Sequence, residues 1–410
     1  MEKWWPVIVA LLVLLLGPQV GLAVTLVALS IMLLLVRYCP KDTFLAIVLP
    51  AALLCRVLVV ALDTAYVLFP YAWDIELFHR NALLILRNLA EGAPVFHGTA
   101  SGLGVKTYSL FVAVVYRTFG EQEGIVRVLN ALFAALAVAK IYQLSLEAMQ
   151  PPRVAQAAAL FSAFLPSQVV FTSLNMRDAL FLFFFASSLC HIISAMKRQR
   201  FWVNTLVAGL QGVLLYLLRP QSVMVLALVL GLFFAVRFFK RRDFAALLLA
   251  AVPLLFAFGT IDLPKLFADI NAEMEWRAAG GAVYLKGMRY HSWFDIVRYL
   301  PLRFVHFTFG PFLGTARSPW LLLASLEGAL IFFLFGLSLI RAVRSRGSTT
   351  FPTECFLLLY CIVGLAASAV VDSNYGTAIR HRLPYVALLP IIAFANVFQR
   401  PGSTIERQRG

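Results

Sequence analysis

Apolar runs long enough to cross a lipid bilayer follow one another along nearly the whole sequence. A helix needs about 20 apolar residues to span the hydrocarbon layer. Twelve candidate spans are residues 4–17, 20–36, 43–62, 125–147, 154–172, 179–196, 203–218, 221–239, 244–261, 320–341, 354–371 and 383–398. The chain is 61% hydrophobic and only 13% charged, well outside the composition of soluble domains. The sequence therefore predicts an all-α, polytopic transmembrane helical bundle of about twelve spans, with residues 1–410 forming a single membrane domain.

The basic residues indicate how these spans are oriented. The net charge is +15, and loops that stay in the cytoplasm retain Lys and Arg. All basic loops fall on the cytoplasmic side if the N-terminus is cytoplasmic and residues 107–119 lie on the membrane without crossing. If residues 107–119 do cross, the N-terminal part inverts. No soluble basic domain is present to carry nucleic acid, so we expect no nucleic-acid partner.

This orientation places two long segments on the extracytoplasmic face. They are residues 63–124 and residues 262–319, and residues 399–410 form a cytoplasmic tail. Short turns at 173–178, 219–220 and 372–382 emerge on the same outer face. Charged residues within or beside apolar spans recur in these segments, where a charge needs a partner or a function. We expect these clusters to converge at one polar site that opens away from the cytosol.

The two long outer segments carry different patterns. Residues 74–90 mix apolar and polar positions at helical spacing and end at Glu91-Gly92, as an amphipathic interfacial helix does. Residues 262–300 combine mixed charge with Trp and Tyr side chains, which suits a segment resting on lipid headgroups. The aromatic stretch 304–311 could re-enter the membrane. Its His306 is more typical of a packed polar residue than of a ligand.

The first outer segment supplies the candidate catalytic base. Asp74 and Glu76 open the amphipathic helix, and such a carboxylate can take a proton from an acceptor hydroxyl. The indole of Trp73 can contact a sugar or acceptor ring. The alternative interpretation is structural, because a carboxylate in this position caps the helix and favours its positive end. The two roles are compatible.

Two shorter turns supply cations. In Arg177-Asp178, the arginine can bind a phosphate, and the aspartate can orient it, act in catalysis or bind a metal. Arg219 lies before Pro220 between two short spans and is a further phosphate-binding candidate. A helix cap next to a snorkelling arginine explains the same residues structurally.

The richest motif runs from Asn374 to Arg382. Arg380, His381 and Arg382 lie beside the last span, and guanidinium groups bind phosphate through two parallel hydrogen bonds. Asn374 and Tyr375 are candidate contacts to the sugar or acceptor. A solvated rim is the structural alternative, although two outer arginines against a span run against the positive-inside bias.

Other ionisable residues lie within spans. Arg56 and Asp63 are two helical turns apart and suit a structural pair. Glu327 needs a polar partner that the sequence does not identify. The cysteines show no metal-binding spacing, and the motifs of nucleotide-binding loops, zinc proteases and serine hydrolases are absent from the sequence. We therefore expect no cofactor, with a divalent metal left open.

The order of these motifs is familiar. It runs through Ala72-Trp73-Asp74, Tyr116-Arg117-Thr118-Phe119-Gly120, Phe164-Leu165-Pro166-Ser167, Asn175-Met176-Arg177-Asp178, Leu218-Arg219-Pro220 and Asn374-Tyr375-Gly376-Thr377. Over about residues 43–398 the chain resembles bacterial integral-membrane glycosyltransferases of the GT-C superfamily that are associated with surface polysaccharides. The resemblance implies a polyprenyl-phosphate-linked sugar donor, transfer on the outer face, and an acidic base in the first outer loop, which maps to Asp74. The chain departs from better-known members in having Asp74-Ile75-Glu76 in place of a paired Asp-Glu or Asp-x-Asp, and in showing no large soluble C-terminal domain.

The resulting hypothesis is a multi-pass glycosyltransferase of the bacterial inner membrane with an extracytoplasmic active site. Its partners would be membrane lipid, a polyprenyl-phosphate-linked sugar, and a glycan or lipid-linked acceptor. One alternative is a repeat-unit polysaccharide polymerase or ligase, which would make a ladder of products. Another is a lipid or glycan transporter, which predicts inverted repeats and charges at the midplane. The sequence shows no repeat, and its charges lie at the ends of spans.

Overall fold

The computed structural model describes most of the chain as helices. The described residues are 23, 25–35, 37–38, 42–69, 73–100, 102–149, 151–239, 263–278, 281–315 and 318–398. The predicted spans 4–17 and 244–261, part of 20–36, and the predicted tail 399–410 lie outside them. The chain forms two compact units: residues 1–147 with 155–220, and residues 148–154 with 221–410.

Within the described ranges, six helices are long and apolar enough to cross a membrane. They are α2 (Thr43–Tyr66), α5 (Glu123–Met149), α8 (Asp178–Met196), α9 (Phe201–Leu218), α14 (Pro319–Arg344) and α15 (Phe351–Val371). Two bent helix pairs raise the number to eight if each counts as one span. The all-helical membrane architecture is therefore confirmed, whereas the predicted number of twelve spans is not.

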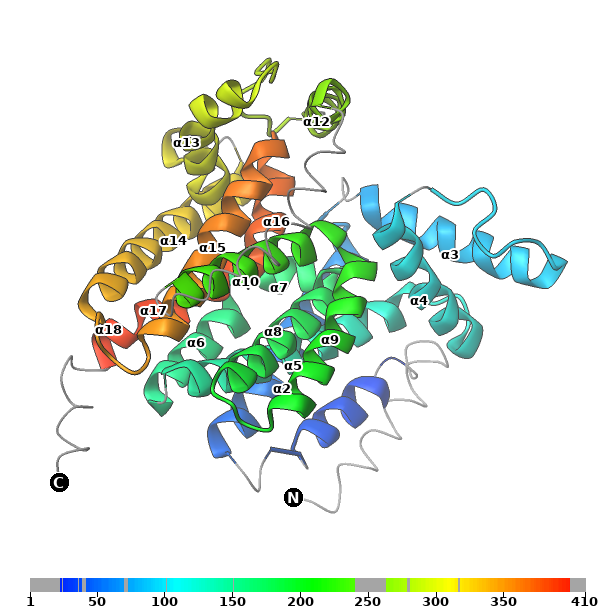
Figure 1. The fold of residues 1–410 in the computed structure, drawn as a ribbon. Coiled ribbons are helices and arrows are strands. Elements are labelled where there is room, and N and C mark those ends of the chain that lie inside the picture. The colour runs from blue at the N-terminus through cyan, green and yellow to red at the C-terminus, as the bar shows by residue number, and fades with distance from the viewer. Residues whose placement is uncertain are drawn as a thin grey trace. The chain divides into compact units, whose positions relative to one another are not determined.

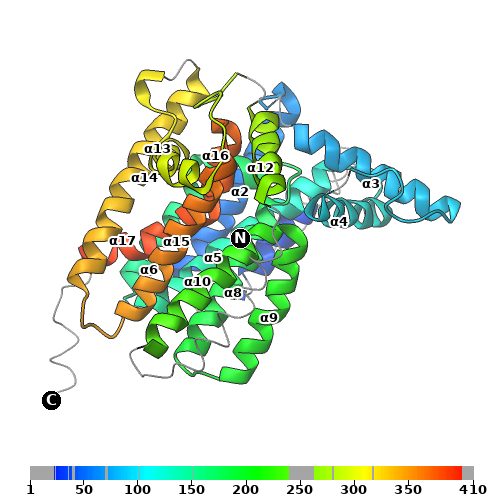
Figure 2. The same cartoon turned by 45° about the horizontal axis from the view of Figure 1, so that its top comes forward.

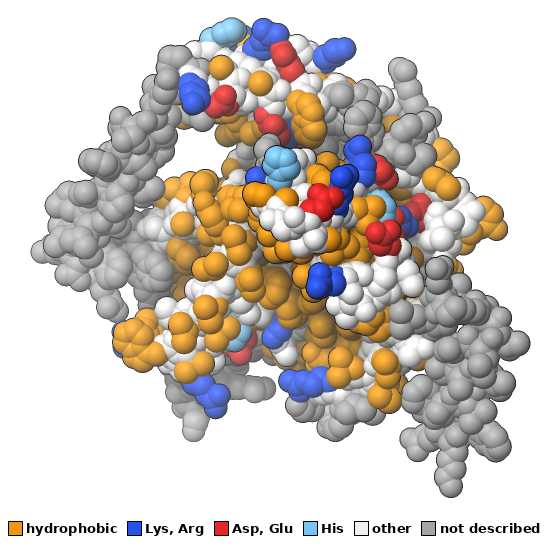
Figure 3. Space-filling model, turned by 90° about the vertical axis from the view of Figure 1, so that its right-hand side faces the viewer, with side chains coloured by type: hydrophobic (Ala, Val, Ile, Leu, Met, Phe, Trp, Pro, Cys, Tyr) orange, Lys and Arg blue, Asp and Glu red, His pale blue; other side chains and the backbone are white. Residues whose placement is uncertain are grey.

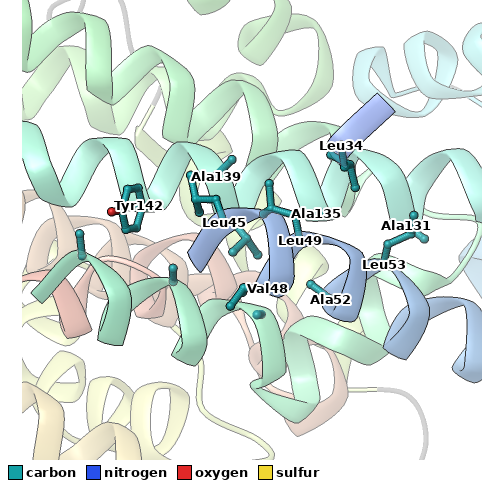
Figure 4. Packing of buried hydrophobic residues seen from close by; sticks show 14 residues of the cluster. Leu34, Leu45, Val48, Leu49, Ala52, Leu53, Ala131, Ala135, Ala139 and Tyr142 are labelled. Atoms are coloured by element: carbon teal, nitrogen blue, oxygen red, sulfur yellow. The ribbon is translucent and has the colours of Figure 1, made fainter. Parts of the chain in front are cut away.

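The first unit packs its helices closely through small residues. Its core joins α2 and α5 to α6 (Pro152–Phe164), and alanines such as Ala52, Ala135 and Ala159 are completely buried there. Figure 4 shows Leu45 and Leu49 of α2 facing α5. Small side chains let helix backbones approach, which strengthens dispersion contacts where lipid gives no hydrophobic driving force between helices. In Figure 1, α8 and α9 lie side by side in the same unit.

A buried arginine bridges the break between α6 and α7 (Pro166–Ser173), where the axis bends by 55°. Pro166 has no N–H, so the carbonyl of Ser162 loses its helical partner. Arg56 of α2 donates to that carbonyl at 3.4 Å, to the carbonyl of Ala163 at 3.0 Å, and to the hydroxyl of Thr172 at 2.8 Å. The guanidinium thus gives the Ser162 carbonyl a donor in place of the N–H that the proline lacks, and it also bonds two further acceptors at the break.

The predicted pairing of Arg56 with Asp63 is wrong. Asp63 instead accepts from Arg127 Nη1 at 2.7 Å and from the backbone N–H of Phe69 at 3.0 Å. Arg127 also binds Glu123 at 2.7 Å. The sequence interval placed both residues on one face of α2, but the broken helix α6–α7 offers Arg56 two carbonyls and a hydroxyl instead.

The second unit is built on α14 and α15, with α13 (Trp293–Phe309) packed against both. Figure 2 shows α13 lying along the part of α14 that is nearest its first residue. α16 (Tyr375–Val386) continues into α17 (Leu389–Ala393) and α18 (Ala395–Phe398) after a bend of 44°. At the other end of α14 and α15, Arg341 pairs with Glu354 at 3.0 Å.

Gly364 provides a test of this packing. A Cβ atom there would lie 2.1 Å from the ring of Tyr385, whereas a Cβ at Gly336 of α14 would meet nothing within 4 Å. We predict that Gly364→Ala lowers stability by about 1–3 kcal/mol through overpacking. Gly336→Ala should leave it unchanged or slightly raised. Thermal unfolding of the purified protein in detergent checks both, and equal melting temperatures would contradict the packing.

Candidate functional site

The predicted amphipathic helix is present as α3 (Trp73–Glu91). Its inner face buries Phe78, Ala82 and Ile85. Phe78 packs edge-on against Tyr108 of α4 (Leu103–Phe119), with ring centroids 4.7 Å apart. On the side of the molecule that Figure 3 shows, acidic and basic side chains lie in small groups, and hydrophobic side chains cover much of the remaining described surface.

The carboxylates of the first outer segment occupy different environments. Asp74 is half-buried in the first turn of α3, where the positive end of the helix favours a negative charge. Glu76 is 65% exposed and forms a surface ion pair with Arg80 at 3.5 Å. Trp73 begins the helix, and its side chain lies outside the described part of the structure. Asp74 is therefore the less exposed of the two carboxylates, and the role of either as a base stays a prediction.

A buried polar network fixes the turn that precedes α8. The side-chain amide of Asn130 donates to the carbonyls of Leu174 at 2.7 Å and Met176 at 3.0 Å. Tyr108 accepts from the same amide at 2.8 Å and donates to Asn175 at 3.1 Å. Neither Asn130 nor Tyr108 was among the predicted site residues. Each looks like an ordinary helical residue in sequence, and only the fold brings them to this turn.

The turn held by this network places Asp178 next to Arg219. These side chains, 41 positions apart, form an ion pair and are only 4% and 3% exposed. The Arg219 guanidinium also lies 4.8 Å from the centroid of the Phe181 ring. The structure thus brings together two residues that the sequence selected separately.

The neighbouring Arg177 donates from Nη1 to the carbonyl of Leu218 at 3.0 Å, at the end of α9. Gly104 makes this approach possible, because a Cβ there would lie 2.1 Å from that carbonyl oxygen and 2.2 Å from Nη1 of the arginine. The beginnings of α4 and α8 and the end of α9 therefore meet around two arginines and one aspartate.

The second unit has its own charged cluster around Asp372, which is completely buried just after α15. Its carboxylate lies 2.7 Å from Nδ1 of His381 and 3.3 Å from Nη1 of Arg277, and it accepts from the hydroxyl of Thr377. Burial by itself would raise the pKa of Asp372, but the His381 hydrogen bond and the charges of His381 and Arg277 outweigh it and hold that pKa below its ordinary value. Asp372 was not among the predicted site residues.

An antiparallel bridge between Val283 and Asn374 joins the loop around Val283 to the start of α16. Asn374 caps that helix by accepting from the N–H of Gly376 at 2.8 Å. Tyr375 stacks on Tyr284 at 4.7 Å, and its hydroxyl lies 2.9 Å from Nδ1 of His306. Sugar or acceptor contact by Asn374 and Tyr375 stays a prediction.

The last two predicted arginines are both buried in α16. Arg380 is 6% exposed, and Arg382 is completely buried. Arg382 Nη1 donates to the carbonyls of Thr308 at 2.9 Å and Gly310 at 2.6 Å, and Nη2 lies 3.8 Å from Glu327. The structure thus supplies the polar partner that Glu327 needed. Phosphate binding by Arg380, His381 and Arg382 stays a prediction.

Among the described residues, no group of three or more His, Cys, Asp or Glu side chains is placed to hold a metal ion. Asp178, the acidic side chain considered for a metal, is instead ion-paired with Arg219.

One comparison with known proteins gives a match. Residues 107–258 match the family model described as dolichyl-phosphate-mannose-protein mannosyltransferase. No curated protein and no solved structure matches the chain. The matched stretch includes Asn130, Arg177, Asp178 and Arg219, which form the polar cluster of the first unit. Together with the apolar helices, the match supports a membrane glycosyltransferase.

We predict that Arg219→Met destabilises the protein by about 3–5 kcal/mol, because it leaves the buried Asp178 carboxylate without its cation. Adding Asp178→Asn to that variant should recover a large part of the loss, because no uncompensated charge remains. The measurement is thermal unfolding of the single and double variants in detergent. A double variant that is less stable than Arg219→Met would refute this account.

The lowered pKa of Asp372 predicts that the stability of the protein depends on pH. A lowered pKa in the folded state stabilises the fold above the ordinary carboxyl pKa of about 3.9, and this contribution is lost as the pH falls through the lowered value. The melting temperature of Asp372→Asn should therefore lie below that of the wild type at pH 6, and the gap should close in acid. The exposed Asp269→Asn is the matched control. A gap that stays constant from pH 6 to pH 3 would rule out the proposed linkage.

Proposed function

We propose that this protein is a glycosyltransferase that moves a sugar from a polyprenyl-phosphate-linked donor to a glycan or lipid-linked acceptor. We further propose that it resides in the bacterial inner membrane and acts on the extracytoplasmic face. The observation that carries the proposal is the match of residues 107–258 to a mannosyltransferase family that uses a lipid-phosphate sugar. That stretch contains the buried cluster of Arg177, Asp178 and Arg219.

The chemistry of this cluster supports a lipid-phosphate substrate. A polyprenyl-phosphate leaving group gains negative charge as its bond to the sugar breaks, so the enzyme needs fixed cations where that charge develops. Arg177 is held through Nη1 at the end of α9, and Arg219 is held by Asp178 and Phe181. Arginines fixed in this way lose little side-chain freedom when a phosphate binds.

The proposed reaction is a direct displacement with inversion. Asp74 removes the proton from an acceptor hydroxyl, and the hydroxyl oxygen attacks the anomeric carbon of the donor sugar. The bond from that carbon to the phosphate oxygen breaks, and the polyprenyl phosphate leaves with the electron pair. In this scheme Asp178 acts by positioning Arg219, and Glu76 is the second candidate base.

In the second unit, we retain Arg380, His381 and Arg382 as proposed phosphate-binding residues. His381 already hydrogen-bonds Asp372, and Arg382 already holds two carbonyls, so both would serve a phosphate only in addition to these contacts.

The roles of the carboxylates are testable by substitution in α3. Asp74→Asn should reduce transfer by about 10²–10⁴-fold, as expected on losing a general base, while the protein still folds. Glu76→Gln should have a much smaller effect. The matched control is Glu91→Gln, which removes an exposed, ion-paired carboxylate from the other end of the same helix and should retain wild-type activity.

Each variant is expressed in cells that lack the native protein, and membranes are prepared from them. The assay then follows radiolabel from synthetic polyprenyl-phosphate hexoses and pentoses into the glycans of these membranes. Full activity in Asp74→Asn would remove Asp74 from the mechanism. Product size separates the alternatives, because a single added sugar supports the transferase and a ladder of repeats supports a polymerase. Movement of donor across vesicles without bond formation would overturn the proposal in favour of transport.

A further inference from the structure

Helix α13 ends in the aromatic stretch 304–311, for which the sequence left re-entry into the membrane open, and it packs along α14 as far as Phe335. The ring of Phe309, at the last position of α13, lies 5.3 Å from Phe332 and 5.7 Å from Phe335 of α14. The carbonyl oxygen of Phe309 would lie 2.1 Å from a Cβ at Gly328. The end of α13 is therefore level with the stretch of α14 around Gly328.

The depth of Gly328 in the membrane follows from its distance along α14 to the cytoplasmic end of that helix. Arg341 of α14 is level with Glu354 of α15, at the end that the basic residues assign to the cytoplasm. From Arg341 back to Gly328, the helix rises by about 20 Å at 1.5 Å per residue. With Arg341 at the inner boundary of a hydrocarbon layer about 30 Å thick, and α14 perpendicular to that layer, Gly328 and the end of α13 would lie about 10 Å inside the outer boundary.

A helix that ends at this depth must satisfy its last carbonyls within the protein, because each unpaired group in hydrocarbon costs several kcal/mol. Arg382 serves two of them, by donating to the carbonyl of Thr308 and, over a longer 3.4 Å, to that of Phe307, and it also donates to the carbonyl of Gly310 just after the helix. Glu327, also at this level of α14, lies 3.8 Å from the same guanidinium and offsets its charge.

The surface of α13 suits this position. Leu302 is 45% exposed and Val305 is 41% exposed, whereas Arg303 and Phe307 are completely buried. Arg303 donates inward, to the carbonyl of Ala369 at 2.8 Å and to the hydroxyl of Ser373 at 3.1 Å. The polar groups of this turn thus face the protein, and the outward face is apolar.

We propose that α13 is a re-entrant helix whose carboxyl-terminal half is inserted into the outer leaflet. Leu302 and Val305 contact the acyl chains of bilayer lipids, and Arg382 closes the inserted end. Exposed apolar side chains at hydrocarbon depth favour acyl chains as the occupant of this face, since no polar headgroup or water is present there. The chain then returns to the surface before α14 begins at Pro319.

Site-directed spin labelling tests the insertion. Nitroxides are attached to single cysteines at Val305, Phe294, Trp276 and Phe333 in a variant without native cysteines, reconstituted in phosphatidylethanolamine–phosphatidylglycerol vesicles. Phe333 of α14 is 68% exposed and serves as the reference for lipid, and Trp276, 71% exposed in α12 (Leu263–Arg277), serves as the reference for the membrane–water interface, which the nickel chelate reaches. Collision rates with molecular oxygen and with a water-soluble nickel chelate give the depth of each label.

The label at Val305 should respond to oxygen and not to nickel, as at Phe333, and the label at Phe294 should respond to nickel, as at Trp276. A Val305 label that nickel reaches as readily as Trp276 would overturn the proposal. The readout needs no substrate, so this result is independent of whether the protein is a transferase.

A second variant tests the packing that holds the helix down. Gly328→Ala should push the Phe309 carbonyl away and raise the nickel accessibility of the Val305 label several-fold. Gly336→Ala, in the same helix but in open space, is the control and should leave the label unchanged. If the two alanine variants give the same accessibility as the parent, α13 is not anchored at Gly328 and the proposed insertion fails.

Discussion

The placement of the buried arginines in this protein depends on backbone carbonyls that have no helical hydrogen-bond partner, at the ends and breaks of helices. In a membrane, such carbonyls find no water, and an unpaired one costs several kcal/mol. Buried guanidinium groups satisfy them at one position after another. Arg56 serves the break at Pro166, Arg177 serves the end of α9, Arg303 serves the end of α15, and Arg382 serves the end of α13. In each case a cation also meets the negative end of a helix dipole.

The same constraint changes how the candidate site is understood. An arginine beside a membrane span invites the interpretation that it binds an anionic substrate. Here part of the hydrogen-bonding capacity of Arg177 and Arg382 goes to carbonyls, and Arg219 is committed to Asp178. A guanidinium has five N–H donors, so a structural contact leaves others for a ligand. The structural contacts then fix the position of the group, which is what stabilising a developing charge requires.

Glycines make several of these contacts possible. At Gly104, Gly310 and Gly328, a Cβ atom would lie less than 3 Å from a carbonyl oxygen or a neighbouring side chain. Each glycine therefore lets its backbone come closer to another backbone, a guanidinium or an aromatic ring than any larger residue permits. Gly209, Gly212 and Gly336 lie in open space by the same test, so the glycine residue type alone does not mark a close approach.

By itself, the sequence determined the class of the protein, because the length and polarity of the apolar runs leave only a membrane helical bundle. It also determined the amphipathic helix at 74–90, whose periodicity is local. The pairing of Asp178 with Arg219, the partner of Glu327 and the bonds of Arg56 were decided only by the tertiary structure. Each joins residues far apart in the chain. A buried charged group pairs with whichever carbonyl or carboxylate the fold brings within reach, and the sequence alone does not show which one that is. Local spacing predicted Asp63 for Arg56 and was wrong, because a broken helix elsewhere in the chain offered that guanidinium more acceptors.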